Sequence, residues 1–287
     1  MAPPDPKDLK ELAVRLAREG PVRTLPTPRR VRLLYKGACL ADTLGTSGAL
    51  FVWEHDYYPQ LYLPSKAFFE PQGFETQFKL GDAIKDAKGR KIAIMWEILV
   101  RPAGSGSRDY DAIRNSIIHF VDDLEGPGEA LRDMVKVNFD AVDQWLEEDT
   151  PIFVHPKDPF KRIDILTSTR PIKVSISGRI VAETSTSMHL YETGLPVRFY
   201  MPLTAIDVSV LRPSKTRTQC PYKGEAEYYN VVISGVEYKD VVWFYNRPTI
   251  ECSAVAGMCC FYNEKVDIAI QEYGGWEKLE RPTTHFG

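Results

Sequence analysis

The chain has 287 residues, and its 36 Lys and Arg against 39 Asp and Glu give a formal net charge of −3 at pH 7. That balance excludes proteins that bind nucleic acid through an excess of basic charge. No stretch approaches the roughly 20 apolar residues of a membrane span, and the first residues lack the apolar run of a secretory signal. We therefore expect a cytoplasmic protein with five free thiols and with neither nucleic acid nor membrane as a partner.

The first predicted element is a helix close to the N-terminus. Its apolar positions recur at helical spacing: Leu9, Leu12, Ala13 and Leu16. Asp5 suits the N-cap and Pro6 the first turn, whereas Gly20-Pro21 should end the helix. Residues 21–28 are expected to form a linker or an extended arm, so we assign residues 1–28 to an N-terminal helix and arm.

An internal repeat follows. Three blocks recur in the same order: residues 31–43 match 172–184, residues 50–64 match 188–202, and residues 137–143 match 261–267 more weakly. Repetition at nearly constant spacing is the signature of a duplicated structural unit. We therefore predict two copies of one domain, at residues 29–149 and 166–287, joined by a proline-containing strap at residues 150–165.

The repeated blocks have the character of strands. Residues 172–176 alternate apolar and polar side chains, and Ser177-Gly178 suits a hairpin turn. Further strands are predicted at residues 188–192, 197–201, 229–233, 238–245 and 258–270. Short strands with frequent turns indicate a mainly β protein, α+β overall, with two tandem antiparallel sheets or half-open barrels.

The first copy is expected to contain additional helices. Residues 109–123 carry isoleucines and a valine at helical spacing, residues 129–137 suit a shorter helix, and residues 140–148 show a similar pattern. The last of these helices conflicts with the repeat, which pairs the same stretch with a strand of the second copy.

Several motifs then resemble a known family. They are Tyr191-Glu-Thr-Gly-Leu-Pro, Tyr200-Met-Pro, Thr216-Arg-Thr-Gln-Cys-Pro-Tyr-Lys-Gly224, Trp243-Phe-Tyr245 and Phe261-Tyr-Asn. With the strap and the Arg281-Pro-Thr-Thr-His-Phe tail, they resemble the two-copy members of DUF427, a domain of unknown function. The resemblance covers residues 29–287 and implies a β fold like the tent-shaped half-barrels of the Mss4-like group.

The resemblance implies no reaction. Members of the family have also been labelled nucleotidyltransferases, but this chain has neither a Gly-Ser followed by paired aspartates nor a phosphate-cradling glycine loop. The first copy is degenerate, because it lacks the Cys-Pro-Tyr-Lys-Gly motif of the second.

The candidate catalytic residues are Cys220, Lys223 and Glu192. A lysine three residues after a cysteine can favour its thiolate, which is the nucleophilic form. The alternative is a cysteine packed beneath a turn, with a solvated lysine. Glu192 can act as an acid or base, can bind a backbone turn, or can pair with Lys223 or Arg198. Its recurrence as Glu54 favours a structural role.

An aromatic set in the second copy is the candidate ligand site. Its members are Tyr191, Tyr200, Tyr222, Tyr228, Trp243 and Tyr245, with Tyr262 nearby. Such side chains line a pocket for a flat or apolar ligand, or they fill the core of a sheet. No cofactor or metal is expected, because the cysteines lack Cys-x-x-Cys spacing and the neighbours Cys259 and Cys260 should face opposite sides of a strand.

Two functions fit this sequence. The first is a small-molecule enzyme that uses Cys220 in an aromatic pocket of the second copy. The second is a non-catalytic ligand- or protein-binding module. Packing of the two copies would cover exposed strand edges, so we expect a monomer that acts as its own pseudo-dimer.

Overall fold

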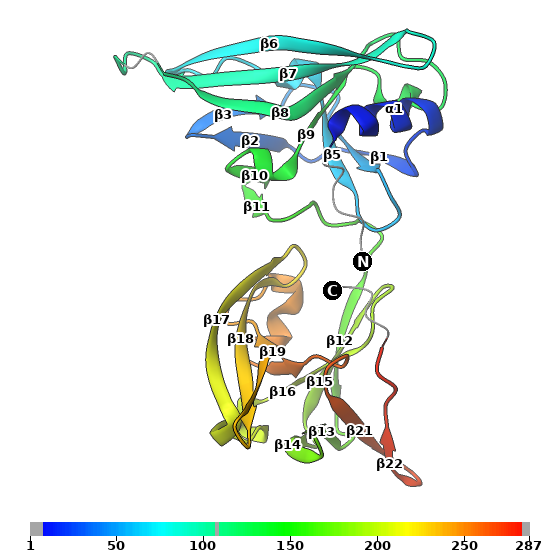
Figure 1. Ribbon diagram of the computed structural model, residues 1–287, viewed down its shortest axis with the longest axis vertical. Helices are drawn as coiled ribbons and strands as arrows, with labels where there is room; N and C mark the ends of the chain where they lie inside the picture. Colours follow the sequence, from blue (N-terminus) through cyan, green and yellow to red (C-terminus); the bar gives the residue numbers. More distant parts are fainter. Residues whose placement is uncertain (1–7, 107–108, 283–287) are drawn as a thin grey trace. The chain divides into compact units, whose positions relative to one another are not determined.

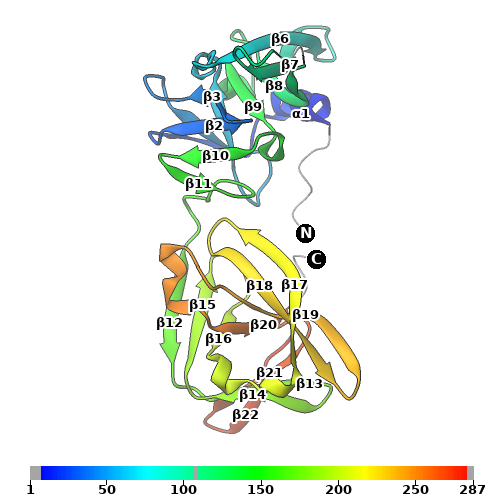
Figure 2. The ribbon, with the colours of Figure 1, turned by 90° about the vertical axis from the view of Figure 1, so that its left-hand side faces the viewer.

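A computed structural model describes residues 8–106 and 109–282. The chain divides into two compact units, one up to Asp158 and one from Pro159 onward (Figures 1 and 2). Each consists mainly of antiparallel strands, so the expected mainly β class is confirmed. Within the described residues, no helix is long and apolar enough to cross a membrane.

The first unit begins with helix α1 (Leu9–Glu19), as predicted. Its N-cap is Asp8, whose carboxylate accepts a hydrogen bond from the Lys10 amide at 2.8 Å. The expected cap at Asp5 and the proline at position 6 lie outside the described residues. The helix ends at Gly20, which adopts a positive φ of 77°.

Two sheets form the rest of the first unit. The larger has seven strands in the spatial order β1 (Arg23–Thr27), β4 (Ala49–Trp53), β5 (Gln60–Pro64), β9 (Met134–Val137), β8 (Asp111–Phe120), β7 (Lys91–Pro102) and β6 (Phe74–Lys85). The smaller has the order β11 (Thr150–Ile152), β10 (Gln144–Glu147), β2 (Val31–Tyr35) and β3 (Ala38–Asp42).

The second unit has the same strand orders. Its seven-stranded sheet runs β12 (Ile163–Ser168), β15 (Ser187–Glu192), β16 (Arg198–Met201), β20 (Cys259–Phe261), β19 (Val236–Phe244), β18 (Gly224–Ile233) and β17 (Leu211–Cys220). Its four-stranded sheet runs β22 (Gly275–Lys278), β21 (Asp267–Glu272), β13 (Ile172–Ile176) and β14 (Arg179–Thr184).

The strand registers of the two units correspond residue by residue. In the first unit Tyr62 on β5 lies opposite Lys136 on β9, and in the second Tyr200 on β16 lies opposite Cys260 on β20. Even the β-bulge recurs, after Leu33 in the β2–β3 pair and after Val174 in the β13–β14 pair. The strand pairing therefore follows the offsets of the sequence repeat, including its weakest block.

Each seven-stranded sheet has both faces buried. One face packs on the four-stranded sheet around apolar cores that include Phe51 and Trp145 in the first unit and Phe199 and Ile268 in the second. In the first unit, the opposite face of the seven-stranded sheet packs against α1. In the second unit a 3-10 helix, η6 (Ile250–Val255), contributes Cys252 and Val255 to the corresponding cluster.

The predicted helices of the first copy were wrong in two places. Residues 109–123 contain strand β8, and residues 140–148 contain a short 3-10 turn, η3 (Phe139–Ala141), and strand β10. In residues 129–137, only η2 (Glu129–Leu131) is helical, and β9 follows. On β8, Ile117 faces the inter-sheet core and Ile118 faces α1, because both faces of the sheet are buried.

Other predicted elements are confirmed. Residues 172–176 form β13, and the following hairpin turn has positive φ at Ser177 (51°) and Gly178 (80°). The strand predicted at 258–270 is confirmed only in part, because the segment forms two strands, β20 and β21, separated by a turn. The remaining smaller elements are η1 (Ser65–Ala67), η4 (Leu203–Ala205) and η5 (Val208–Val210).

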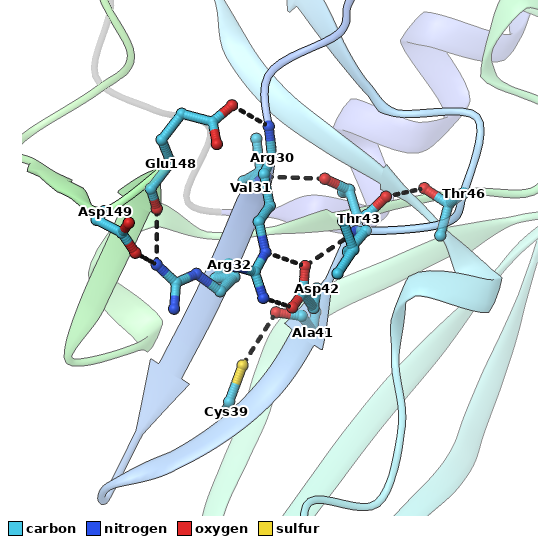
Figure 3. A network of polar contacts seen from close by, with 11 residues as sticks. Arg30, Val31, Arg32, Cys39, Ala41, Asp42, Thr43, Thr46, Glu148 and Asp149 are labelled. Atoms are coloured by element: carbon cyan, nitrogen blue, oxygen red, sulfur yellow. Dashed lines mark hydrogen bonds and ion pairs between the residues drawn. The ribbon is translucent and has the colours of Figure 1, made fainter.

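A polar network ties β2 to its neighbours in the first unit (Figure 3). The Arg30 guanidinium pairs with Asp42 on β3, and the Val31 amide donates to Thr43 Oγ1 at 2.8 Å. Arg32 on β2 pairs with Asp149 beyond β10. Because these partners belong to adjacent strands or their ends, we interpret the network as a support of the small sheet rather than as a site.

Candidate functional site

The Cys-Pro-Tyr-Lys-Gly motif forms the tight hairpin between β17 and β18, with Cys220 opposite Gly224. Gly224 has φ of 100°, and a Cβ there would lie 3.1 Å from the carbonyl oxygen of Arg247. Thr249 holds the turn from outside: its Oγ1 donates to the Tyr222 carbonyl at 2.6 Å and its amide to the Lys223 carbonyl at 3.1 Å. The hairpin is therefore fixed on both sides.

This hairpin places Lys223 against Glu192 at the end of β15. The two side chains form an ion pair and hydrogen bond although both residues are over nine-tenths buried. Of the alternatives open to Glu192 in the sequence, pairing with Lys223 is the one that forms. Arg198, the other candidate, instead pairs with Glu264 at 2.7 Å.

Electrostatics keep Lys223 charged. Burial lowers the pKa of its ammonium group, but the Cys220 sulfur and the Glu192 carboxylate outweigh burial and raise the pKa above its ordinary value. Lys223 is therefore a fixed cation at neutral pH and not a general base. Cys220 is half-buried, whereas Cys252, whose sulfur lies 3.6 Å from the Tyr222 carbonyl, is fully buried.

The predicted aromatic residues are brought together on one face of the second seven-stranded sheet. Register aligns Tyr200, Cys260, Trp243 and Tyr228 in one row across four neighbouring strands. Tyr245 joins the same cluster. Each of the four aromatic side chains is at most 7% exposed. The cluster is packed, and the cavities of about 610 and 670 Å³ in the described chain are lined by other residues.

Internal hydrogen bonds explain why this packed cluster uses Tyr and Trp rather than Phe. Trp243 Nε1 donates to the Tyr200 hydroxyl at 3.1 Å, and the Tyr228 hydroxyl lies 2.7 Å from Thr218 Oγ1. Burial raises the pKa of Tyr200 and of Tyr245 well above the ordinary tyrosine value. Both phenols therefore stay protonated and are poor bases at neutral pH.

The other predicted ligand residues lie apart from this row. Tyr222 is buried within the hairpin, with the Lys161 ammonium 5.6 Å from its ring centroid. Tyr191 is 38% exposed and lines the cavity of about 610 Å³. Because Tyr191 directly precedes Glu192 on β15, the two side chains point to opposite faces of the sheet.

Histidine does not reach the hairpin from β15. The His189 ring packs edge-to-face against Phe199 of the inter-sheet core, on the face of the sheet opposite Leu190. Burial and the nearby charge of Arg170 lower the pKa of His189. His155 belongs to the other unit, where its ring stacks on Tyr58 at 4.2 Å.

The cysteine-rich strand β20 separates its thiols as predicted. Cys259 belongs to the inter-sheet core, and Cys260 belongs to the aromatic cluster on the other face. Burial raises the pKa of Cys259 to about 12 and raises that of Cys260 as well. Within the described residues, no three His, Cys, Asp or Glu side chains are grouped closely enough to hold a metal ion.

Sequence reasoning missed a matching ion pair in the first unit. Glu54, the equivalent of Glu192, lies 2.7 Å from the ammonium group of Lys136, and the Tyr62 hydroxyl donates to Glu54 at 2.9 Å. All three side chains are essentially fully buried. Lys136 occupies the position of Cys260, not that of Lys223. A lysine inside the apolar strand Met-Val-Lys-Val was the sequence signal for it.

The half with the Cys-Pro-Tyr-Lys-Gly hairpin is also the half that a family model matches. Residues 164–272 match the model of the domain of unknown function DUF427. The match lies within the second half of the chain. It spans β12 to β21 and includes the hairpin, Glu192 and the aromatic row. No curated protein matches the chain.

Proposed function

We propose that the DUF427 domain in the second half acts on a small molecule at the Cys220 hairpin, with the Cys220 sulfur as the nucleophile or polar anchor. One observation carries this proposal. A buried ammonium group, Lys223, is held by Glu192 in a rigid turn beside a half-buried thiol. A fixed cation next to a thiol favours the thiolate, which is the reactive form.

The three residues have different roles in this proposal. The Cys220 thiolate adds its sulfur electron pair to the electrophilic carbon of a polarised double bond in the ligand, and the π electron pair of that bond moves to its electronegative atom. Lys223 remains charged and stabilises negative charge on the sulfur before attack and on the ligand after it. Glu192 orients Lys223 and maintains its charge, so we assign it as a positioning residue rather than as the acid or base.

Saturation kinetics test whether a ligand pocket adjoins the thiol. The full chain is treated with chloroacetamides that carry aromatic groups of increasing size, and labelling of Cys220 is followed by peptide mass spectrometry. A rate that reaches a plateau with reagent concentration indicates binding before reaction. A rate that rises linearly for every reagent and equals the rate for Cys39, the other half-buried thiol, would contradict the proposal. Cys220→Ser provides the blank.

We further propose that residues 29–149 are a second, divergent copy of the same domain, joined to residues 166–287 by the strap at 150–165. Identical strand orders and the shared bulge support this interpretation. In this proposal the first copy serves as a scaffold without a thiol site. The cation that pairs with its buried glutamate is Lys136, which stands at the strand position that Cys260 occupies in the second copy.

A non-catalytic binding module is the second candidate. The observation that favours it is the packing of Tyr200, Trp243 and Tyr228, which leaves little open space above the aromatic row. In that case Cys220 would be a structural thiol under the turn. Linear labelling kinetics together with retained ligand binding in Cys220→Ser would favour this module over the enzyme.

A further inference from the structure

The second unit is hollow at one end of its two-sheet sandwich. A cavity of about 610 Å³ lies there, within the size range of small-molecule sites. Its apolar walls are side chains that also belong to the inter-sheet core or pack against it: Val197, Phe199, Val266, Ile268, Ile270 and Leu279. Tyr191 and Pro196 extend the wall toward solvent.

The first unit fills the same place with aromatic rings. The register of β4, β9 and β10 makes Trp53 equivalent to Tyr191, Phe139 equivalent to Asn263, and Trp145 equivalent to Ile268. Phe139 and Trp145 stack with centroids 5.3 Å apart and planes 5° apart, and both tryptophans are 2% exposed. One sandwich therefore has two forms in this chain, one filled and one open.

The open form carries a buried polar atom that needs a partner. Asn263 lines the cavity and is 8% exposed. Its Nδ2 donates to the Val197 carbonyl at 2.7 Å, which fixes the orientation of the amide. Among the residues that the structure describes, none donates a hydrogen bond to Asn263 Oδ1. This oxygen is shielded from solvent, so a ligand donor reaches it only when neighbouring side chains move. Until then the unpaired acceptor is destabilising.

The charges at the rim select against anions. Arg170 pairs with Glu272 at 2.8 Å, and Arg281 pairs with Asp267 at 2.9 Å. Glu280 adds a further carboxylate to the cavity lining. Asp267 also pairs with Lys278 at 3.0 Å. Arg170, Lys278 and Arg281 are therefore matched by the three carboxylates of Glu272, Asp267 and Glu280, and the rim carries no net positive charge for a carboxylate or a phosphate.

We propose that this cavity is a binding site for a neutral ligand with a flat apolar body and one N–H or O–H donor, which bonds to Asn263 Oδ1. The apolar walls take the place of the rings that fill the first unit, and the amide oxygen sets the orientation of the ligand. The site lies on the opposite face of β15 from Glu192 and is independent of the Cys220 hairpin.

Indole and 1-methylindole form a matched pair of probes, because they share a flat body and only indole has an N–H donor. The full chain is titrated with each probe and followed by amide NMR, including the side-chain amide of Asn263. We expect saturable indole binding with a Kd of roughly 1 mM or tighter and a shift of the Asn263 resonance. The affinity for 1-methylindole should be about five- to tenfold weaker.

Three variants separate the features of the site. The double variant Asn263→Phe/Ile268→Trp introduces side chains like the stacked pair of the first unit and should weaken indole binding while the core amide spectrum is retained. Asn263→Ala keeps the cavity open and should bind the two indoles equally. Cys220→Ser should bind indole as the wild type does, so failure of the thiol proposal is distinguishable from failure of this one.

Two results would overturn the inference. One is a wild-type chain that shows no saturable binding of indole. The other is unchanged indole affinity in Asn263→Phe/Ile268→Trp, because two added aromatic rings take up space that the ligand needs.

Discussion

Lys223 and Lys136 reach equivalent glutamates from different elements of the fold. Glu192 and Glu54 share one position in the two units, but their lysines come from a hairpin in one case and from β9 in the other. A buried ion pair often stabilises a fold no better than apolar residues of the same volume. The recurrence of the pair by two routes therefore suggests that a charged pair at this place serves more than packing.

Removal of one partner should be costly. Lys136→Met leaves the fully buried Glu54 carboxylate without its cation, and we expect a loss of about 3–5 kcal/mol of unfolding free energy. The double variant Glu54→Leu/Lys136→Met should recover most of that loss. Urea denaturation measures both. A single variant as stable as the wild type would show that the carboxylate finds another partner or takes up a proton without cost.

His189 predicts a dependence of stability on pH. Its pKa is lowered in the folded protein by burial and by Arg170, so the unfolded chain binds more protons just below the ordinary histidine pKa of 6.5. This group therefore supports folding above about pH 6.5, and that support is lost as the pH falls toward the folded pKa. His189→Gln should flatten the dependence between about pH 7 and pH 5 in urea denaturation. An unchanged slope would contradict this assignment.

The hairpin β17–β18 depends on a glycine for two separate reasons. Gly224 has a positive φ, and its missing Cβ leaves room for the Arg247 carbonyl. Gly235 in the next hairpin has a positive φ of 81°, but no atom lies within 4 Å of the place that a Cβ would occupy there. Both alanine variants should lose about 1 kcal/mol for backbone strain, and Gly224→Ala should lose roughly 1–2 kcal/mol more. Equal losses in thermal denaturation would show that the nearby Arg247 carbonyl does not restrict the side chain at position 224.

Sequence patterns predicted the strands where one face is clearly more polar than the other. Residues 172–176 alternate, and Ser177-Gly178 permits the left-handed turn that joins β13 to β14. The pattern misled at residues 109–123, because β8 is buried on both faces. Ile113 and Ile117 are four residues apart, a spacing that places two side chains on one face of a strand as well as of a helix, and both lie in the inter-sheet core.

The site was predicted in its residue types but not in its geometry. Glu192 and Lys223 are 31 residues apart, and only the fold shows that they pair. Tyr and Trp density suggested an open pocket, whereas Trp243 Nε1 donates to the Tyr200 hydroxyl within a packed cluster. The open cavity lies where the second unit has smaller side chains than the first, and only the comparison of the two units reveals it.

At the scale of the whole molecule, each unit has its own buried clusters. Those of the first unit use residues between Leu9 and Ile152, and those of the second use residues between Ile163 and Leu279. We therefore predict that residues 159–287 fold when expressed alone, since a core that is complete in one segment supports independent folding. A dispersed amide NMR spectrum is the expected result, and a collapsed spectrum typical of an unfolded chain would contradict the assignment of domains.

In the proposed function, Lys223 activates Cys220. The pH profile of alkylation by iodoacetamide tests this role. The five cysteines of the native full chain are followed separately by peptide mass spectrometry, with half-buried Cys39 as the control because burial raises the pKa of that thiol. We predict that Cys220 reacts fastest near pH 7 and that Lys223→Met slows it about tenfold. If Cys220 reacts at the same rate as Cys39, and if this rate is unchanged in Lys223→Met, then Lys223 does not activate Cys220.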